Sequence, residues 1–183
     1  MLTNGIIELL PADTALAEEA ADFYRRNRAF LRPFEAVREE AFFTAEHQRK
    51  LLEQEMEARR QQTGFRFYIR LAQGSEKLIG VIGLNNVVWG AFYSAHLGYK
   101  MDHGYINGGY MTMAVALITR FAFETLGLHR IEANVMPRNG ASLRVLEKNG
   151  YYNEGISKDY LKINGVWEDH IHMVKLNRAM HEK

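Results

Sequence analysis

Two adjacent glycines precede an apolar segment in the middle of the chain, within Asn107-Gly108-Gly109-Tyr110-Met111-Thr112. Apolar side chains then recur at helical spacing, so this run joins the end of a strand near Met101 to the start of a buried helix. Glycine lets a backbone approach a ligand closely, and the first turn of a helix offers unpaired N–H groups that favour an anion. The run therefore predicts a pyrophosphate-binding loop, although similar glycine pairs also occur in ordinary loops.

The strand pairing is expected to change at this loop. Before it, residues 65–71, 78–84 and 91–101 are predicted to form antiparallel strands, with a turn at 73–75. After it, a helix over 111–123 leads to a strand over 130–135. A strand–helix–strand crossover joins parallel neighbours, and ligands bind where the topology of an α/β sheet changes. The position of the loop therefore supports a binding function.

The remaining segments complete one sheet flanked by helices. A first strand is expected over residues 5–10, a helix from Asp13 or Thr14 to about residue 30, and a second helix from Thr44 to near residue 64. Asn139 caps a helix that runs to about residue 148, and a hairpin of 151–163 and 166–176 turns over Asn164-Gly165. We predict an α/β fold with a single mixed β-sheet, in which antiparallel N-terminal strands precede a central parallel pair and helices lie on both faces. Residues 1–183 are expected to form a single domain.

The composition excludes several classes of protein. Lys plus Arg number 23 and Asp plus Glu 22, so the net charge of +1 gives no field toward nucleic acid or an anionic membrane. The N-terminus lacks the features of a signal peptide and no apolar run is long enough to span a membrane, so we expect a cytoplasmic protein. The chain has 0 cysteines, which excludes an acetyl-cysteine intermediate in any acyl transfer.

The chain resembles the GCN5-related N-acetyltransferase (GNAT) superfamily, and within it the RimJ-type ribosomal-protein-alanine N-acetyltransferases. The residues that carry the resemblance are the run Phe30-Leu31-Arg32-Pro33-Phe34-Glu35-Ala36-Val37-Arg38, His129-Arg130-Ile131, Met136-Pro137, Asn139, Ser142, Lys158-Asp159-Tyr160-Leu161, Trp167 and Asp169-His170. The superfamily's coenzyme-A motif, Gln/Arg-x-x-Gly-x-Gly/Ala, aligns with residues 106–111, where Gly109 is kept and Ile106 and Met111 depart from it.

The resemblance implies acetyl-coenzyme A as co-substrate, without a metal, and a protein N-terminus as acceptor. That N-terminus would be an alanine or serine of the ribosomal-protein type. The cofactor site is expected to contain Met101, Asn107, Gly108, Gly109, Tyr110, Met111, Thr112, Asn139 and Ser142.

The catalytic positions of the family are only partly filled. In related N-terminal acetyltransferases the general base is a glutamate, whose place is taken by Asn134, and the nearest carboxylate on the same strand face is Glu132. Glu132 is therefore a candidate base, or else a salt-bridge partner. The usual tyrosine acid is replaced by Leu146, so Ser142 becomes the candidate donor to the leaving thiolate. Ser142 and Asn139 can also be read as an ordinary first-turn serine and a helix cap.

The acceptor side offers weaker indications. Phe34, Glu35 and Arg38 are expected to wall an acceptor groove, or else to form a packed turn between helices. His170 and His172 lie on one strand face, but a third metal ligand is not evident, so we expect no metal. The alternatives are acetylation of a polyamine, an amino sugar or a drug amine, or a non-catalytic acetyl-coenzyme-A-binding or ribosome-associated protein. No membrane or direct nucleic-acid partner is expected, and the sequence leaves the oligomeric state open.

Overall fold

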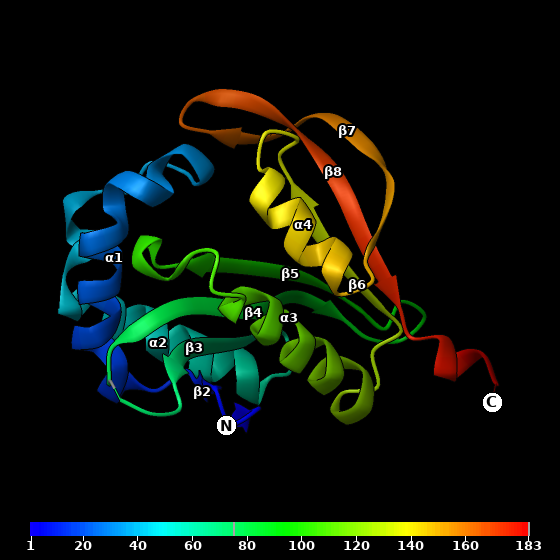
Figure 1. The fold of residues 1–183 in the computed structure, drawn as a ribbon, viewed down its shortest axis with the longest axis horizontal. Coiled ribbons are helices and arrows are strands. Elements are labelled where there is room, and N and C mark those ends of the chain that lie inside the picture. Colours follow the sequence, from blue (N-terminus) through cyan, green and yellow to red (C-terminus); the bar gives the residue numbers. More distant parts are fainter. Residues whose placement is uncertain (75, 183) are drawn as a thin grey trace.

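One mixed sheet of eight strands forms the centre of the computed structural model, which describes residues 1–74 and 76–182 (Figure 1). The strand order is β1-β2-β3-β4-β5-β6-β8-β7. The strands are β1 (Leu2–Thr3), β2 (Ile7–Pro11), β3 (Phe65–Leu71), β4 (Leu78–Val88), β5 (Ser94–Met101), β6 (Arg130–Val135), β7 (Tyr152–Ile163) and β8 (Val166–Leu176). β5 and β6 pair in parallel, whereas the other neighbouring pairs are antiparallel. The predicted fold class is confirmed.

Helices cover both faces of the sheet, because its strands alternate apolar side chains between the two sides. On one face lie α1 (Ala17–Leu31) and α2 (Ala45–Arg60), whose apolar residues pack with Tyr68 of β3. On the other lie α3 (Tyr110–Arg120) and α4 (Gly140–Lys148), packed with Phe65 and Phe67 of the same strand. Figure 1 shows α3 and α4 together on one side of the strands, with α1 and α2 grouped around the opposite side.

Side-chain caps start the helices where the sequence predicts. The Thr44 hydroxyl accepts a hydrogen bond from the His47 N–H at 3.3 Å, and Asn139 Oδ1 accepts one from the Ser142 N–H at 3.2 Å. Asp13 instead caps a short 3-10 turn, Thr14–Leu16, and α1 follows it. The predicted two-residue turn of the last hairpin is confirmed, since Asn164 and Gly165 both have positive φ angles, of 50° and 84°.

Several boundaries differ from those predicted. The strand pair β1–β2 extends the sheet at the N-terminus, where only one strand was expected. β5 begins at Ser94 rather than at residue 91, because Gly90 and Tyr93 adopt positive φ angles that form the connection from β4. The apolar helix α3 changes at its end to a π-helical turn, Phe121–Thr125. In the predicted turn at 73–75, Ser75 lies outside the described residues.

Candidate active site

The two parallel strands at the centre of the sheet pair over only three residues each. Ser94, Ala95 and His96 of β5 are in register with Arg130, Ile131 and Glu132 of β6. Past these pairs the strands diverge. A cavity between them is lined by residues 97–101 of β5 and by residues 133–136, which are the end of β6 and the residue after it. The opening exposes backbone N–H and C=O groups along one edge of each strand, which can hydrogen-bond to an extended ligand that carries amides.

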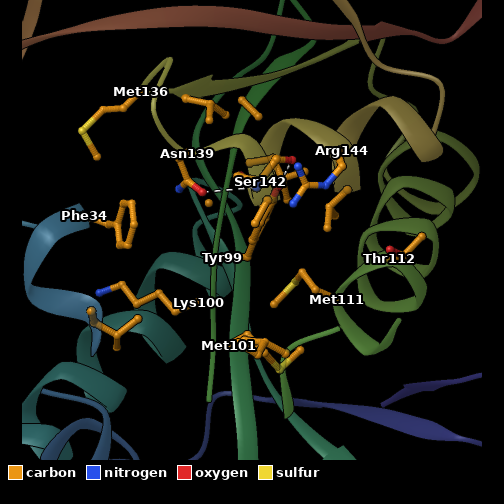
Figure 2. A pocket seen from close by; sticks show the side chains of 18 of the residues that line it. Phe34, Tyr99, Lys100, Met101, Met111, Thr112, Met136, Asn139, Ser142 and Arg144 are labelled. Carbon is orange, nitrogen blue, oxygen red and sulfur yellow. Dashed lines mark hydrogen bonds between the residues drawn. The ribbon is translucent and has the colours of Figure 1, made fainter. Parts of the chain in front are cut away.

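The cavity has a volume of about 480 Å³ and extends to both sides of the sheet. This size lies within the range usual for small-molecule sites, roughly 300–1,000 Å³. On the α3–α4 side it is lined by residues of the glycine loop and of α4, and on the opposite side by the end of α1 and by the β7–β8 hairpin. Figure 2 shows this division, with Phe34 and Lys100 on one side of β5 and Met111, Thr112 and Arg144 on the other. Tyr99 and Ser142 lie between them.

The predicted pyrophosphate loop lines the α3–α4 side. Gly109 is the residue before α3, with a left-handed φ of 77°, and a β-carbon built at this position meets no atom within 4 Å. α3 therefore begins with its first N–H groups directed out of the helix at the edge of the cavity, where they can bind an anion. Most of the predicted cofactor residues line the cavity, namely Met101, Asn107, Gly109, Tyr110, Met111, Thr112, Asn139 and Ser142. Gly108 does not line it, and a β-carbon there would lie 2.6 Å from the Tyr110 ring.

Two cations from α4 also line the cavity, Arg144 and Lys148. They are four residues apart and so project from one face of the helix. The sequence did not by itself indicate a role for these two residues. Their spacing of four, on a helix that follows the predicted cofactor-binding Asn139, is a pattern that would have predicted one. Together with the start of α3 they make this side of the cavity suitable for a phosphorylated ligand.

Ser142 contacts a tyrosine that the sequence analysis did not select. The Tyr99 hydroxyl lies 2.7 Å from Ser142 Oγ and 3.1 Å from the Ser142 carbonyl oxygen. Burial raises the pKa of Tyr99 to about 12, against the opposing effect of the Ser142 hydrogen bond, so this hydroxyl keeps its proton at neutral pH. Leu146, which the sequence resemblance places at the family's tyrosine position, is fully buried in the apolar core. A proton donor is thus present in the cavity, but it comes from β5.

Glu132 and Asn134 point to the same face of β6 and have different surroundings. Glu132 does not line the cavity, and its carboxylate accepts hydrogen bonds from Arg130 at 2.8 Å and from His172 at 2.7 Å. Burial alone would raise the pKa of Glu132, but these two partners outweigh it and lower the pKa. This is the salt-bridge arrangement that the sequence left open as the alternative to a base. Asn134 does line the cavity, and its Oδ1 is buried without a hydrogen-bond partner in the described part of the chain.

The predicted acceptor residues are separated by the structure. Phe34 and Glu35 line the cavity at the end of α1, whereas Arg38 does not, and its guanidinium group lies 4.6 Å from the centre of the Phe42 ring. Glu35 forms an ion pair with Lys100 of β5, and both side chains are largely buried. Burial lowers the pKa of Lys100, although the adjacent Glu35 carboxylate acts in the opposite direction.

The β7–β8 hairpin closes the acceptor side of the cavity. Arg138 donates hydrogen bonds to the Pro33 carbonyl oxygen at 3.0 Å and to the Glu168 carboxylate at 2.7 Å. Leu161, Ile163 and His170 of the hairpin line the cavity opposite Phe34. A molecule that reaches the centre from this side must therefore pass between the end of α1 and the hairpin.

The structure gives further information on metals and membranes. Among the side chains that the structure describes, those of residues 1–74 and 76–180, no group of three or more His, Asp or Glu is placed to hold a metal ion. His170 and His172 do share a strand face, but His172 lies between Ser157 and Glu132 instead of facing the cavity. Over the same residues, none of the helices combines the length and apolar character needed to span a bilayer.

Comparison with known proteins relates this geometry to a family. The family described as "Acetyltransferase (GNAT) domain" matches residues 8–152. The chain is 41% identical over 177 residues to "Probable N-acetyltransferase YjcK" of Bacillus subtilis, which covers 97% of each chain. It is 39% identical over 152 residues to the [ribosomal protein uS5]-alanine N-acetyltransferase of Escherichia coli, covering 82% of this chain and 77% of that one. The structure of Mycobacterium smegmatis RimJ in complex with CoA-disulfide superimposes with a TM-score of 0.89 at 26% identity, over 98% of this chain and 86% of that one.

Proposed function

Because this chain belongs to the GNAT family of acetyltransferases, we propose that it moves the acetyl group of acetyl-coenzyme A to the α-amine of a protein N-terminus, by direct transfer in a ternary complex. The observation that carries the proposal is the cavity through the sheet, which is open to a phosphorylated ligand on one side and to an acceptor on the other. Both substrates can meet in it between β5 and β6.

The donor side fits coenzyme A in charge and in shape. The start of α3 and the cations Arg144 and Lys148 can bind the phosphate groups of coenzyme A, its pyrophosphate among them. The unpaired edges of β5 and β6 can hydrogen-bond to the amide-bearing arm of coenzyme A. When bound, acetyl-coenzyme A supplies a thioester as the activated acetyl group. We assign to Ser142 the donation of a hydrogen bond to the departing sulfur and to Tyr99 a hydrogen bond to Ser142 Oγ, since both residues line the cavity beside the divergence of the strands.

The acceptor side favours a peptide over a polyamine. Of the described residues that line the cavity, Glu35 is the only carboxylate, and it is already neutralised by Lys100. A polyamine would bring several cations into this space without a free counter-charge. An uncharged peptide backbone with one terminal amine fits the mixed apolar and amide lining formed by Leu31, Phe34, Leu161 and Asn134.

The choice of an α-amine also agrees with the residue at the family's base position. An α-amino group has a reference pKa near 8, so roughly a tenth of it is neutral at physiological pH, whereas a lysine amine near 10.4 is almost entirely charged. Removing a proton from an α-amine therefore needs only a weak base, and Asn134 stands where stronger bases occur in relatives. The ribosomal-protein acceptor named for the 39% identical enzyme is the form of substrate we propose here.

A panel of amines tests the proposal directly. Peptides with Ala or Ser at a free N-terminus, the same peptides with a blocked N-terminus and an internal lysine, spermidine and glucosamine would each be incubated with acetyl-coenzyme A. Acetylation of the free α-amines, located by mass spectrometry, is the expected result. Acetylation of the internal lysine or of spermidine, with the free N-termini untouched, would refute it.

A further inference from the structure

One buried histidine lies on the acceptor side of the cavity. His170 of β8 is 3% exposed and lines the cavity. Its Nδ1 lies 2.9 Å from the Glu168 carbonyl oxygen. A carbonyl can only accept a hydrogen bond, so Nδ1 must carry the proton, which leaves a lone pair on Nε2 of the neutral ring. No hydrogen bond of the described residues involves Nε2. With this tautomer, the lone pair of the neutral His170 ring is on Nε2, in a protein-lined cavity.

A second polar group in the same place lacks a partner. Asn134 Nδ2 donates a weak hydrogen bond of 3.4 Å to the Tyr160 hydroxyl, and Oδ1 is buried without a partner among the described residues. The Tyr160 ring lies 5.6 Å from the His170 ring, so the tyrosine contacts both side chains. A buried acceptor without a partner destabilises the folded protein, and a hydrogen bond from an N–H group of a ligand would remove that cost. The unpaired oxygen therefore indicates that the ligand donates hydrogen bonds, as an amine does.

The other ionisable groups near this end of the cavity are already engaged. Glu35 and Lys100 neutralise each other. Glu132 is held by Arg130 and by His172, and His172 also contacts Ser157 at 2.6 Å. The Tyr160 hydroxyl accepts from Asn134. Among the described residues at this end of the cavity, His170 Nε2 is the remaining site that can accept a proton from a ligand.

From these contacts we infer that His170 is the catalytic base that deprotonates the acceptor amine, while Asn134 Oδ1 accepts a hydrogen bond from the same nitrogen. This inference rests on the proposed acetyl transfer and adds a residue to it. The ammonium form of the acceptor gives one proton to His170 Nε2, and the neutral nitrogen then attacks the thioester carbonyl carbon. The new N–C bond forms, the C–S bond breaks, and a second nitrogen proton passes to the sulfur to give free coenzyme A. His170 finally releases its proton to solvent, so the net reaction yields an amide, a thiol and one proton.

The variant His170→Asn tests the assignment in the full chain. An asparagine amide can replace Nδ1 as donor to the Glu168 carbonyl, but it cannot act as a base. The matched control is His172→Gln, which changes a histidine of the same strand face that does not line the cavity. Both variants and the wild type would be assayed with whichever amine of the panel above the wild type acetylates best. The panel of amines tests the proposed acceptor. The ratio of kcat between variant and wild type, measured with the same amine, tests the role of His170 independently of the panel.

For His170→Asn we expect kcat at pH 7 to fall about 10²- to 10⁴-fold, the contribution typical of a general base, with acetyl-coenzyme A affinity unchanged. The loss should shrink toward pH 9, because an α-amine with a reference pKa near 8 is by then mostly neutral without help. His172→Gln should keep wild-type kcat. A His170→Asn enzyme within about threefold of wild type would overturn the assignment, given the size expected for a base. A deficit that is the same at pH 7 and pH 9, or an equal loss in His172→Gln, would also overturn it.

Discussion

Replacing Ser142 by alanine should slow acetyl transfer about 10- to 150-fold without weakening acetyl-coenzyme A binding. Tyr99 Oη lies 2.7 Å from Ser142 Oγ, so the tyrosine can donate to the serine while the serine donates onward to the departing sulfur. A hydrogen bond to a charged group contributes about 1.5–3 kcal/mol. At about 1.36 kcal/mol for each factor of ten in rate, this range gives the stated loss.

Tyr99→Phe should have a smaller effect that depends on Ser142. The tyrosine acts on the sulfur only through the serine, so its loss removes one neutral hydrogen bond of about 0.5–1.5 kcal/mol, or roughly a 2- to 13-fold decrease in kcat. In the Ser142→Ala background the same change should have no further effect, because the residue that relays the hydrogen bond is already gone. The double variant is therefore expected to equal Ser142→Ala.

Release of free thiol provides the assay for this cycle, and the absence of cysteine from the chain removes any protein background. Tyr151→Phe is the matched control, since the Tyr151 hydroxyl lies 2.9 Å from Thr119 Oγ1 in a buried pair that does not line the cavity. An unchanged rate in Ser142→Ala would show that the serine is only part of the helix start. Multiplicative losses in the double variant would refute the relay, and parallel lines in double-reciprocal plots would refute direct transfer.

Two further predictions follow from the backbone and from a buried ion pair. Gly109→Ala and Gly127→Ala place a β-carbon in open space at similar left-handed φ angles, 77° and 66°, so each variant should lose roughly 1 kcal/mol or more of stability in denaturant unfolding. Calorimetry should show weaker acetyl-coenzyme A binding only for Gly109→Ala, because Gly127 does not line the cavity. Equal affinities of the two variants would exclude the loop as the pyrophosphate site. Asp102→Asn breaks the ion pair with Arg26, in which the aspartate is 2% exposed, while Arg26 keeps its ion pair with Asp22. The loss should therefore cost about 1.5–3 kcal/mol at pH 7 in urea unfolding. Glu46→Gln, in the exposed pair with Lys50, should cost at most about 0.5 kcal/mol. Burial would raise the pKa of Asp102, but Arg26 and the Gly104 N–H outweigh it and lower the pKa. The ionised carboxylate therefore stabilises the fold above the unfolded pKa near 3.9, and the difference in unfolding free energy between Asp102→Asn and wild type should narrow as the pH falls below that value. A difference in unfolding free energy that is independent of pH would contradict this.

Local features of the chain were predictable because each depends on neighbouring residues. The change from helical to alternating spacing marks the strands after residue 64. Thr44 and Asn139 cap their helices through side-chain oxygens that each accept a hydrogen bond from the N–H group three residues later. Gly109 needs a positive φ that other residues adopt at a cost, so its role as the residue before α3 could be read from the sequence. The resemblance to a family added the cofactor, and the comparisons support it.

The contacts of individual site residues could not be predicted from the sequence, for a physical reason. Glu132 is the nearest carboxylate to Asn134 along β6, which left a base and a salt-bridge partner as alternatives, because distance along a strand does not show what faces a side chain across the sheet. His172, which holds its carboxylate, is 40 residues away in the sequence. Arg38 likewise follows Phe34 and Glu35 closely, but the chain turns after the short helix Arg32–Phe34 and carries Arg38 against Phe42.

The sequence by itself determined most of the elements, the caps Thr44 and Asn139, the turn of the last hairpin and the loop before α3, because these are set by contacts within a few residues. It also determined the parallel crossover, because a strand–helix–strand order joins parallel neighbours. The tertiary structure alone decided which side chains meet. β8 rather than β7 lies beside β6, which brings His170 and Asn134 to one end of the cavity, and the register of β5 brings Tyr99 to Ser142, 43 residues later. Strand order and register depend on how the whole sheet buries its two apolar faces, so they cannot be predicted from the pattern of residues within one segment.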